Sequence, residues 1–402
     1  MKTKLKAIII LSILILPANA QKLNEAYLQA KADMIREQYA EAGQKILSIP
    51  ASERSSPMYL TLGKSYYRTG KYNDAVRFLI IADSLKANPE AKLYTARAYA
   101  MMSQPGKAIE WLQKYLGQRD KLSEGEISLD PAFAKIEHSK EWKTLWSKEW
   151  YQAAERKSAE AAVLIKRKKY TEALGIIDVE IANRTSSARF YALRAKVYEA
   201  MEQYGPAYES AQTAIRMRNN NAEYNADAAN IAVRVQKYDI ALDNINQAIR
   251  HDPYQLDLYL QRAAILRMNK RYDDARNDLN FYFKYLPADA KALYQIGMAE
   301  TDAGNPLAGI EYFTMLIDQD RTKSDYFMAR ANAGIKANNY TMAGDDLSQA
   351  LDLNPSLPDA WCKKGMVLQQ EGKLEDACYY WKTALGMGSR EAAEYIYKYC
   401  AK

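Results

Sequence analysis

The chain has 402 residues, of which 26% are charged, and its formal net charge at pH 7 is +7. This balance is small for the length, so composition does not favour nucleic acid as a partner. The chain contains only 12 prolines, which agrees with a fold that is helical throughout. A chain of this length would ordinarily be expected to form two or three domains.

The first twenty residues have the layout of a secretory signal peptide. Three lysines precede an apolar run at residues 7–16, and a small-x-small triplet follows at residues 18–20. We expect cleavage before Gln21, and the loss of the three lysines lowers the net charge from +7 to +4. The apolar run is too short for a comfortable membrane span, which argues against an uncleaved anchor. The sequence therefore predicts an exported protein of the bacterial periplasm or cell envelope, with secretion as the alternative.

A period of 34 residues runs through the rest of the chain. Two near copies, KYDIALDNINQAIRHDP at 237–253 and RYDDARNDLNFYFKYLP at 271–287, place Ala241 and Ala275 34 residues apart. Steps of the same size reach further small residues in both directions. An aromatic residue stands three positions before most of these small residues: Tyr39, Tyr72, Tyr170, Tyr204, Tyr238, Tyr272 and Tyr340. A fixed period of this length predicts a repeat protein.

Each repeat has the pattern of two helices joined by a short turn. Large apolar residues flank a small residue at helical spacing in the first half, and a second helix follows the turn. Small residues at this point let two antiparallel helices approach closely, where a bulky side chain would be overpacked. The small residues of the first helices are Gly63, Ala96, Ala161, Ala195, Ala229, Ala263, Gly297, Ala331 and Gly365.

This pattern resembles the tetratricopeptide repeat family, whose motif also has 34 residues. The copy that begins at Ser56 carries the key residues of the motif, and so does the copy that begins at Pro358. Gly309, where the family usually has alanine, and a degenerate first helix in the unit near Glu155 depart from it. The matching residues are Tyr59, Leu62, Gly63, Tyr66, Ala75 and Leu79 in the first copy, and Trp361, Gly365, Ala377 and Trp381 in the second.

The resemblance implies an all-α fold, a right-handed α-α superhelix of about ten helical hairpins with a C-terminal capping helix. Unit starts lie near residues 23, 56, 89, 154, 188, 222, 256, 290, 324 and 358. Such a solenoid grows by adding units rather than by enlarging one core. The expected organisation is a signal peptide (1–20), a block of three repeats (21–116), a connector (117–153), a block of seven repeats (154–388) and a capping helix (389–402).

The connector does not follow the repeat. Asp130 and Pro131 have the pattern of a helix N-cap followed by proline at the first helical position, and Phe133 and Ile136 would then share one face. A second helix is expected to carry Trp142, Trp146 and Trp150 on one stripe, at i, i+4 and i+8. These tryptophans either form a partner surface or plug the end of the first three repeats. The cost of exposing three large apolar side chains favours the plug.

Three cysteines lie near the C-terminus: Cys362, Cys378 and Cys400. A final helix folded antiparallel on its predecessor would bring Cys400 to the level of Cys378, so a disulfide between them is one hypothesis in an oxidising compartment. Buried free thiols that pack as small apolar groups are the alternative. No histidine lies near any cysteine in the sequence, so no metal site is expected.

No catalytic constellation is present in the sequence. The two histidines, His138 and His251, do not stand in a metal-binding or catalytic spacing. There is no nucleophile elbow, phosphate-binding glycine loop or dinucleotide fingerprint. We therefore expect no enzyme activity and no cofactor, and an enzyme or glycan-binding protein is the less favoured alternative.

The family resemblance implies that the first helices line a concave groove. Residues at the groove positions are mostly cationic, with Glu199 and Asp302 as the notable acids, so the sequence predicts a groove for an acidic or C-terminal peptide segment of a protein partner. Pairing of these cations with acids on neighbouring repeats is the alternative. The candidate groove residues are Lys64, Tyr67, Arg68, Arg97, Lys196, Arg234, Arg267 and Lys336.

Taken together, these features predict a non-catalytic scaffold or adaptor of the bacterial cell envelope. The first alternative is a structural or assembly subunit of an envelope complex, which would contact a folded partner through its convex face or through the tryptophan connector.

Overall fold

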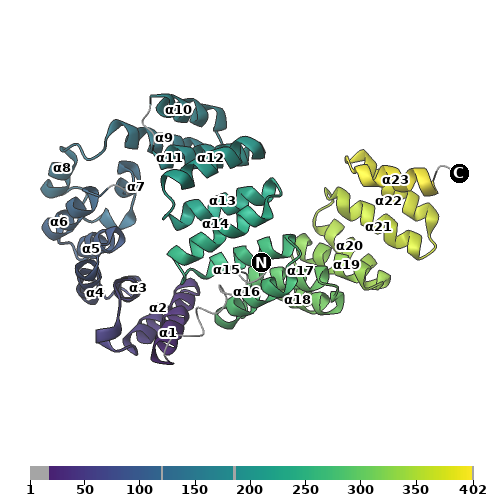
Figure 1. The fold of residues 1–402 in the computed structure, drawn as a ribbon, viewed down its shortest axis with the longest axis horizontal. Helices are drawn as coiled ribbons and strands as arrows, with labels where there is room; N and C mark the ends of the chain where they lie inside the picture. Colours follow the sequence, from purple (N-terminus) through teal and green to yellow (C-terminus); the bar gives the residue numbers. More distant parts are fainter. Residues whose placement is uncertain (1–17, 119–120, 184–186, 401–402) are drawn as a thin grey trace, which may run out of the picture. The chain divides into compact units, whose positions relative to one another are not determined.

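The computed structural model describes residues 18–118, 121–183 and 187–400 (Figure 1). All regular secondary structure in these ranges is helical, as the repeat pattern predicts. Most of the predicted signal peptide, residues 1–17, lies outside the described residues. None of the helices that the structure describes is both long and apolar enough to cross a membrane.

Three helical hairpins form the N-terminal block. In Figure 1 the second helices α4 and α6 lie on one side of this row of hairpins, and α3 and α5 lie on the other. A single 3-10 turn, η1 (Ala51–Glu53), follows the first hairpin. The hairpins are α1 (Ala18–Ile35) with α2 (Tyr39–Leu47), α3 (Ser56–Arg68) with α4 (Tyr72–Leu85), and α5 (Pro89–Met101) with α6 (Pro105–Leu116).

The connector contains three short helical segments, α7 (Glu124–Ser128), η2 (Pro131–Phe133) and α8 (Lys140–Trp146). The side chain of Asp130 accepts a hydrogen bond from the Ala132 backbone N–H, so the predicted N-cap is confirmed, although it begins a 3-10 turn and not an α-helix. Phe133 and Ile136 are both buried, as expected from their shared face.

Seven further hairpins follow the connector, and a final single helix, α23 (Arg390–Tyr399), follows them. With the N-terminal block this makes ten hairpins in the described residues, and the predicted repeat architecture is confirmed. The hairpins are α9 (Ala153–Lys166) with α10 (Tyr170–Ala182), α11 (Ala188–Ala200) with α12 (Tyr204–Met217), α13 (Ala222–Arg234) with α14 (Tyr238–His251), α15 (Leu256–Met268) with α16 (Tyr272–Tyr285), α17 (Ala290–Asp302) with α18 (Pro306–Gln319), α19 (Ser324–Lys336) with α20 (Tyr340–Leu353), and α21 (Pro358–Gln370) with α22 (Leu374–Gly386).

The described residues form two compact units. The first contains the residues up to Lys237 together with Gln247–Leu256, and the second contains Tyr238–Asn246 and the residues from Asp257 onward. Within the first unit the ring of Tyr254 lies 4.7 Å from the ring of Tyr27, between centroids. The Tyr254 hydroxyl also donates to Asn24 Oδ1 at 2.7 Å. Helix α1 is therefore held by a segment about 230 residues later as well as by its neighbours in sequence.

Large and small residues complement each other where the two helices of a hairpin cross. A Cβ atom on Gly365 would lie 2.6 Å from Cδ1 of the buried Trp381, and a Cβ on Gly297 would lie 2.7 Å from Cε1 of Phe313. Contacts this short would force the aromatic ring to move. Glycine at these two positions therefore makes room for a large core residue of the second helix, as the repeat pattern predicts.

The turn inside each hairpin places one residue in the left-handed region of backbone conformation. Glycine is favoured there because it has no Cβ. Only three of the ten hairpins use it, and the other seven hold an ordinary residue at φ between 55° and 60°. The residues at this turn position are Glu37, Gly70, Ser103, Lys168, Glu202, Gln236, Lys270, Gly304, Asn338 and Gly372.

A cation on the first helix ties neighbouring hairpins together in the C-terminal block. Arg330 of α19 donates from Nε and Nη2 to both carboxylate oxygens of Asp346 on α20, at 2.9 and 2.8 Å. Its Nη1 donates at 3.0 Å to Thr314 Oγ1 on α18, in the preceding hairpin. The two partners lie 16 residues after and 16 residues before the arginine. One side chain therefore joins its own hairpin to the preceding one.

A similar arrangement is found around Arg262, two repeats before Arg330, and around Arg194, two repeats before Arg262. Arg262 bonds both oxygens of Asp278 at 2.7 and 2.6 Å and donates to Asn246 Oδ1 at 2.8 Å. Arg194 donates to Ser210 Oγ at 3.0 Å and to Asp178 Oδ1 at 3.4 Å. Lys364 takes a related role, with Ser348 Oγ at 2.9 Å and the Gly344 carbonyl at 2.6 Å. We call these four cations the staple residues. They were not predicted from the sequence, although the regular spacing of the three arginines is visible there.

Candidate functional site

The predicted groove residues all lie on the first helices of their hairpins. Lys64, Tyr67 and Arg68 are on α3 and Arg97 is on α5, both in the N-terminal block. The remaining four are Lys196 on α11, Arg234 on α13, Arg267 on α15 and Lys336 on α19.

The N-terminal part of this set forms a connected aromatic surface. The ring of Tyr67 contacts the ring of Tyr94 edge to face, with centroids 5.3 Å apart, and it contacts Tyr72 at 5.6 Å. The cations of Lys64 and Arg97 lie over the Tyr94 ring, 5.2 and 4.9 Å from its centroid. Burial raises the pKa of Tyr67 to about 12, so its hydroxyl stays protonated and able to donate at neutral pH. Tyr94 was missed from the sequence because no groove position of the motif pointed to it.

Two of these cations are already paired with carboxylates. Lys64 Nζ lies 2.6 Å from Glu90 Oε1, on the first helix of the next hairpin. Arg97 Nε lies 2.6 Å from Asp130 Oδ2, the N-cap residue of the connector. Neither cation therefore offers its full charge to a ligand.

Lys196 lies between two acids of the following hairpin. Its Nζ is 2.9 Å from Glu223 Oε1 and 3.0 Å from Asp227 Oδ2. Burial lowers the pKa of Lys196, but the charges of Asp227 and Glu223 outweigh this effect and the pKa is raised. The lysine is therefore charged and compensated by the protein itself.

Asp302 of α17 forms ion pairs with two of the predicted cations. Arg267 Nη1 lies 2.6 Å from Asp302 Oδ2, and Lys336 Nζ lies 2.8 Å from Oδ1. Burial alone would raise the pKa of Asp302, but the hydrogen bonds from Lys336 and Arg267 outweigh it and the pKa is lowered. This carboxylate is thus ionised and bridges three successive hairpins.

The expectation of a cationic groove that meets few acids is therefore corrected for Lys64, Arg97, Lys196, Arg267 and Lys336. Acids near the start of a first helix, such as Glu90 and Glu223, are favoured there by the helix dipole. They also lie close enough to pair with the lysine of the preceding hairpin. The sequence showed the acids but could not show this pairing.

Arg68 and Arg234 differ from the other cations. Both are exposed, and neither forms an ion pair with a described residue. The guanidinium of Arg68 lies 5.7 Å from the ring centroid of Tyr39, and that of Arg234 lies 5.8 Å from the centroid of Tyr204. Of the predicted groove cations, these two therefore remain without an ion pair among the described residues.

Glu199 on α11 gives the site a titratable acid. Burial, and then the charge of Asp227, raise the pKa of Glu199, although Arg234 and Lys196 oppose them. Burial also raises the pKa of Asp227. An acid whose pKa is higher in the folded state is harder to ionise there, so it opposes folding as the pH rises above its unfolded pKa of about 4.3.

We therefore expect Glu199→Gln to raise the thermal unfolding midpoint at pH 7. The difference between the two proteins should disappear below about pH 4, where the acid is protonated in both the folded and the unfolded state. Thermal unfolding followed by circular dichroism across this range measures it, with Glu209→Gln on the exposed face of α12 as the control. An equal difference at pH 4 and pH 7 would contradict the role of ionisation.

The connector tryptophans pack against the end of the N-terminal block. Trp142 is buried, with its ring centroid 5.4 Å from Phe133 and 5.7 Å from Trp146. Trp146 and Trp150 are partly buried and pack on the same core, to which α5 and α6 contribute.

The predicted helical stripe of three tryptophans is wrong in one respect. Helix α8 ends at Trp146, so Trp150 is not on it. The indole N–H of Trp150 instead donates to the Leu145 carbonyl at 2.9 Å, and Ser147 N donates to the Lys143 carbonyl. A side chain that folds back onto the last turn satisfies a carbonyl that a longer helix would have used.

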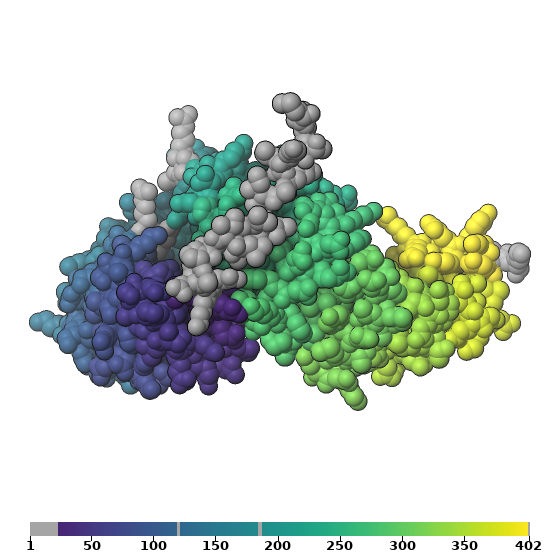
Figure 2. Space-filling view, turned by 60° about the horizontal axis from the view of Figure 1, so that its bottom comes forward, coloured from purple at the N-terminus to yellow at the C-terminus, as the bar shows by residue number. Residues whose placement is uncertain are grey.

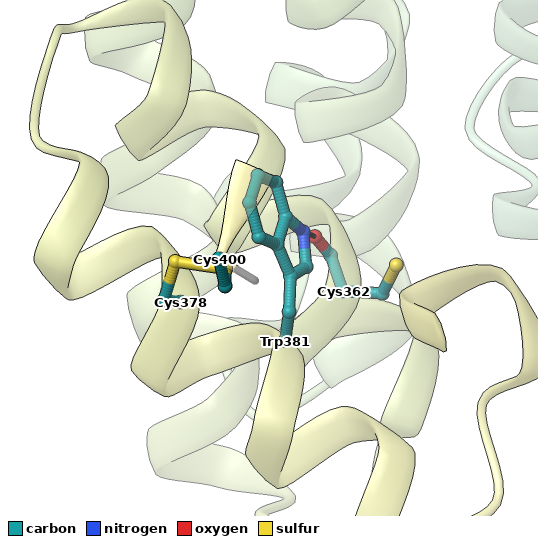
Figure 3. Close-up of a disulfide and its surroundings, with 4 residues drawn as sticks. All are labelled: Cys362, Cys378, Trp381 and Cys400. Carbon is teal, nitrogen blue, oxygen red and sulfur yellow. Dashed lines mark hydrogen bonds between the residues drawn. A yellow bond between two sulfur atoms is a disulfide. The ribbon is translucent and has the colours of Figure 1, made fainter. Parts of the chain in front are cut away.

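The cysteines separate into one disulfide and one thiol. The structure joins Cys378 of α22 to Cys400, the residue directly after α23, with their Cα atoms 5.8 Å apart. Cys362 is free and buried. In Figure 3 the disulfide and Cys362 lie on opposite sides of the Trp381 indole, whose N–H donates to the Cys362 carbonyl at 3.0 Å. In the part of the chain that the structure describes, no group of three or more histidine, cysteine, aspartate or glutamate residues could hold a metal ion.

Comparison with known proteins gives a family and a fold. Residues 60–123 and 226–280 match the family model described as tetratricopeptide repeat. A tetratricopeptide repeat protein from Parabacteroides merdae ATCC 43184 is 15% identical, with 60% of this chain and 94% of that chain covered and a TM-score of 0.53. No curated protein sequence matches the chain.

Two further solved structures show lower similarity. The APC/C hetero-tetramer Cut9–Hcn1 gives 13% identity, 96% and 97% coverage of this chain and that chain, and a TM-score of 0.46. The type IV pilus biogenesis factor PilW gives 16% identity, 51% and 95% coverage, and a TM-score of 0.46. The two matched segments belong to the tetratricopeptide repeat family, and the observed hairpins give the described residues an all-α superhelical repeat fold, a fold typical of protein-interaction scaffolds.

Proposed function

We propose that the protein is an exported, non-catalytic scaffold of the bacterial cell envelope that binds an acidic segment of a partner protein along the first helices of its N-terminal unit. The observation that carries this proposal is the pair of exposed arginines, Arg68 and Arg234, which lie against aromatic rings and form no ion pair with a described residue. The export part rests on the signal-peptide layout of residues 1–20.

Arginine suits this role better than the paired lysines do. Its planar guanidinium stacks on an aromatic ring and still presents donors to a carboxylate, often through two parallel hydrogen bonds. The tyrosines that accompany the arginines belong to a residue type enriched in protein interfaces. An acidic peptide would thus find charged donors and apolar contact area on the same helices, whereas the internal ion pairs keep those helices rigid.

Binding of a fluorescein-labelled peptide of glutamates and serines tests the chemistry. Reversal of Arg68 and Arg234 to glutamate should weaken binding at least tenfold, because each substitution replaces an attraction by a repulsion. Arg321→Glu, in the exposed connection between α18 and α19, is the matched control and should leave the affinity unchanged. The affinity should also fall with salt. Equal affinity of the double variant and the natural protein would contradict the proposed surface.

A partner surface at the connector has less support. Trp142 is buried, and Trp146 and Trp150 pack on the core of the N-terminal block. Their aromatic area is thus used mainly within the molecule, in agreement with a structural plug.

A further inference from the structure

We propose that the Cys378–Cys400 disulfide is a reducible latch that holds α23 as a cap over the last repeat. With the bond formed, α23 covers the apolar face of α21 and α22. After reduction by a dithiol, α23 detaches and this face opens, together with the thiol of Cys362. The proposal concerns a part of the chain that the proposed peptide-binding surface does not use.

The noncovalent hold on α23 comes from one face of a short helix. The helix has ten residues, its main neighbour is α22, and the only side chain that it buries completely is that of Ala392. Isolated helices of this length are marginal in water. The outer face of α23 is open, since Tyr397 is 85% exposed. Helix α23 belongs to the C-terminal part of the chain that is coloured yellow in Figure 2.

The face beneath α23 is strongly apolar. Trp381 is completely buried and stacks on Tyr395 and Tyr399 of α23, with centroids 5.0 and 5.7 Å apart. Ala377 and Ala384 of α22 are completely buried in the same cluster. Loss of α23 would therefore expose an indole and the apolar surface around it to water or to another helix.

The burial of the Cys362 thiol depends on α23. The side chain of Cys362 is completely buried in the same cluster, and the side chain of Ser389, the N-cap residue of α23, lies close enough to the thiol to lower its pKa. Burial raises the pKa of the Cys362 thiol to about 11, so the thiol is protonated and unreactive while the cap is closed. Removal of α23 takes away both the Ser389 contact and the cover.

The disulfide fixes the C-terminal end of α23 to α22. One end of α23 is joined to α22 through the turn at Gly388, and the other end is joined to it covalently through Cys400. The bond closes a loop with a sequence separation of 22 residues. Loop-closure entropy for such a loop implies that breaking it raises the equilibrium constant for opening on the order of a hundredfold.

The chemical step is thiol–disulfide exchange. A thiolate of the dithiol attacks one sulfur of the bond, which breaks the S–S bond and leaves a mixed disulfide and one free cysteine thiolate. The second thiol of the reductant then displaces the other cysteine. The protein disulfide gains two electrons and two protons to become two thiols, and the dithiol is oxidised to a disulfide.

The test is the rate at which N-ethylmaleimide modifies Cys362 in the folded protein, measured by peptide mass spectrometry. Cys378→Ser with Cys400→Ser represents the unlatched state and should react on the order of a hundredfold faster than the oxidised protein. The natural protein treated with dithiothreitol should behave likewise, and reoxidation should restore the slow rate. Cys362→Ser in the oxidised protein should remain unlabelled.

Hydrogen exchange distinguishes a disulfide that holds only α23 from one that stabilises the whole C-terminal end. A latch predicts that reduction accelerates exchange in α23 while α19 and α20 stay protected. An unchanged rate at Cys362 after reduction would show that α23 stays docked without the bond and would overturn the proposal. Faster exchange throughout α19–α22 would equally overturn it, because the bond would then stabilise the whole C-terminal end.

Discussion

Replacement of Arg330 by methionine is expected to lower the free energy of unfolding by about 3–5 kcal/mol, because it leaves a buried carboxylate without its cation. The Asp346 side chain is only 4% exposed, and both of its oxygens accept from Arg330. Hydrogen bonding to Asp346 raises the pKa of Arg330, so the guanidinium stays charged at neutral pH. The same substitution removes the bond to Thr314 in the preceding hairpin.

A double variant distinguishes the unpaired charge from a loss of packing. Arg330→Met with Asp346→Leu removes both charges and should recover most of the lost stability, since apolar replacement of a buried pair is often neutral. Arg321→Met is the matched control, because it breaks an exposed pair with Asp318 at 3.5 Å and should cost at most about 0.5 kcal/mol.

Denaturant unfolding gives the free energies for these variants, and hydrogen exchange shows which hairpins respond, as repeat arrays need not unfold in one step. Equal losses from Arg330→Met and Arg321→Met would contradict the structural role of the staple.

Gly309→Ala is expected to cost about 1–3 kcal/mol, although alanine is the usual residue of the family at this position. The Thr301 hydroxyl donates to the Gly297 carbonyl at 2.7 Å and fills the space that faces Gly309. A Cβ atom on residue 309 would collide with Thr301 Oγ1 and would lie 2.9 Å from Gly297 O. The backbone of α17 is part of this contact, so a side-chain movement alone cannot relieve it.

The cause of this cost can be checked by making room on the facing helix. Thr301→Ala combined with Gly309→Ala removes the hydroxyl and should recover part of the loss, because the Gly297 carbonyl stays close to the added Cβ. Gly175→Ala is the control at an open helical site, where nothing lies within 4 Å of the added Cβ. It should stabilise the protein by about 0.5–1 kcal/mol through helix propensity. Thermal or denaturant unfolding of the natural protein, the two single variants and the double variant measures these changes in stability. A neutral effect of Gly309→Ala alone would contradict the proposed clash with Thr301 and Gly297.

Most of the fold could be predicted from the 34-residue spacing of the repeat. The regular spacing of the small residues and the tyrosines predicted the hairpins and the close approach at Gly365, because backbone packing of this kind depends on residue size at fixed positions. The departure at Gly309 was visible in the sequence. Its cause was not, since it depends on how the Thr301 side chain is oriented on the facing helix.

The candidate site was less predictable than the fold. The pattern placed the cations on the first helices, but whether a cation is free depends on side chains of the next hairpin, such as Glu223 and Asp227 beside Lys196. The end of α8 was missed for a similar reason. Trp150 fits a helical stripe by spacing, yet its hydrogen bond to the Leu145 carbonyl favours a chain that leaves the helix.

In-cell crosslinking would show which protein contacts the exposed arginines. A photo-crosslinking amino acid at Arg234, with a control at Arg321, would be activated in living cells, and adducts in the envelope fraction would be identified by mass spectrometry. Capture of one dominant protein from position 234 through an acidic segment, and not from position 321, is the predicted result. No specific adduct at position 234, together with a strong adduct from a site next to Trp146, would contradict the account and place the function at the connector.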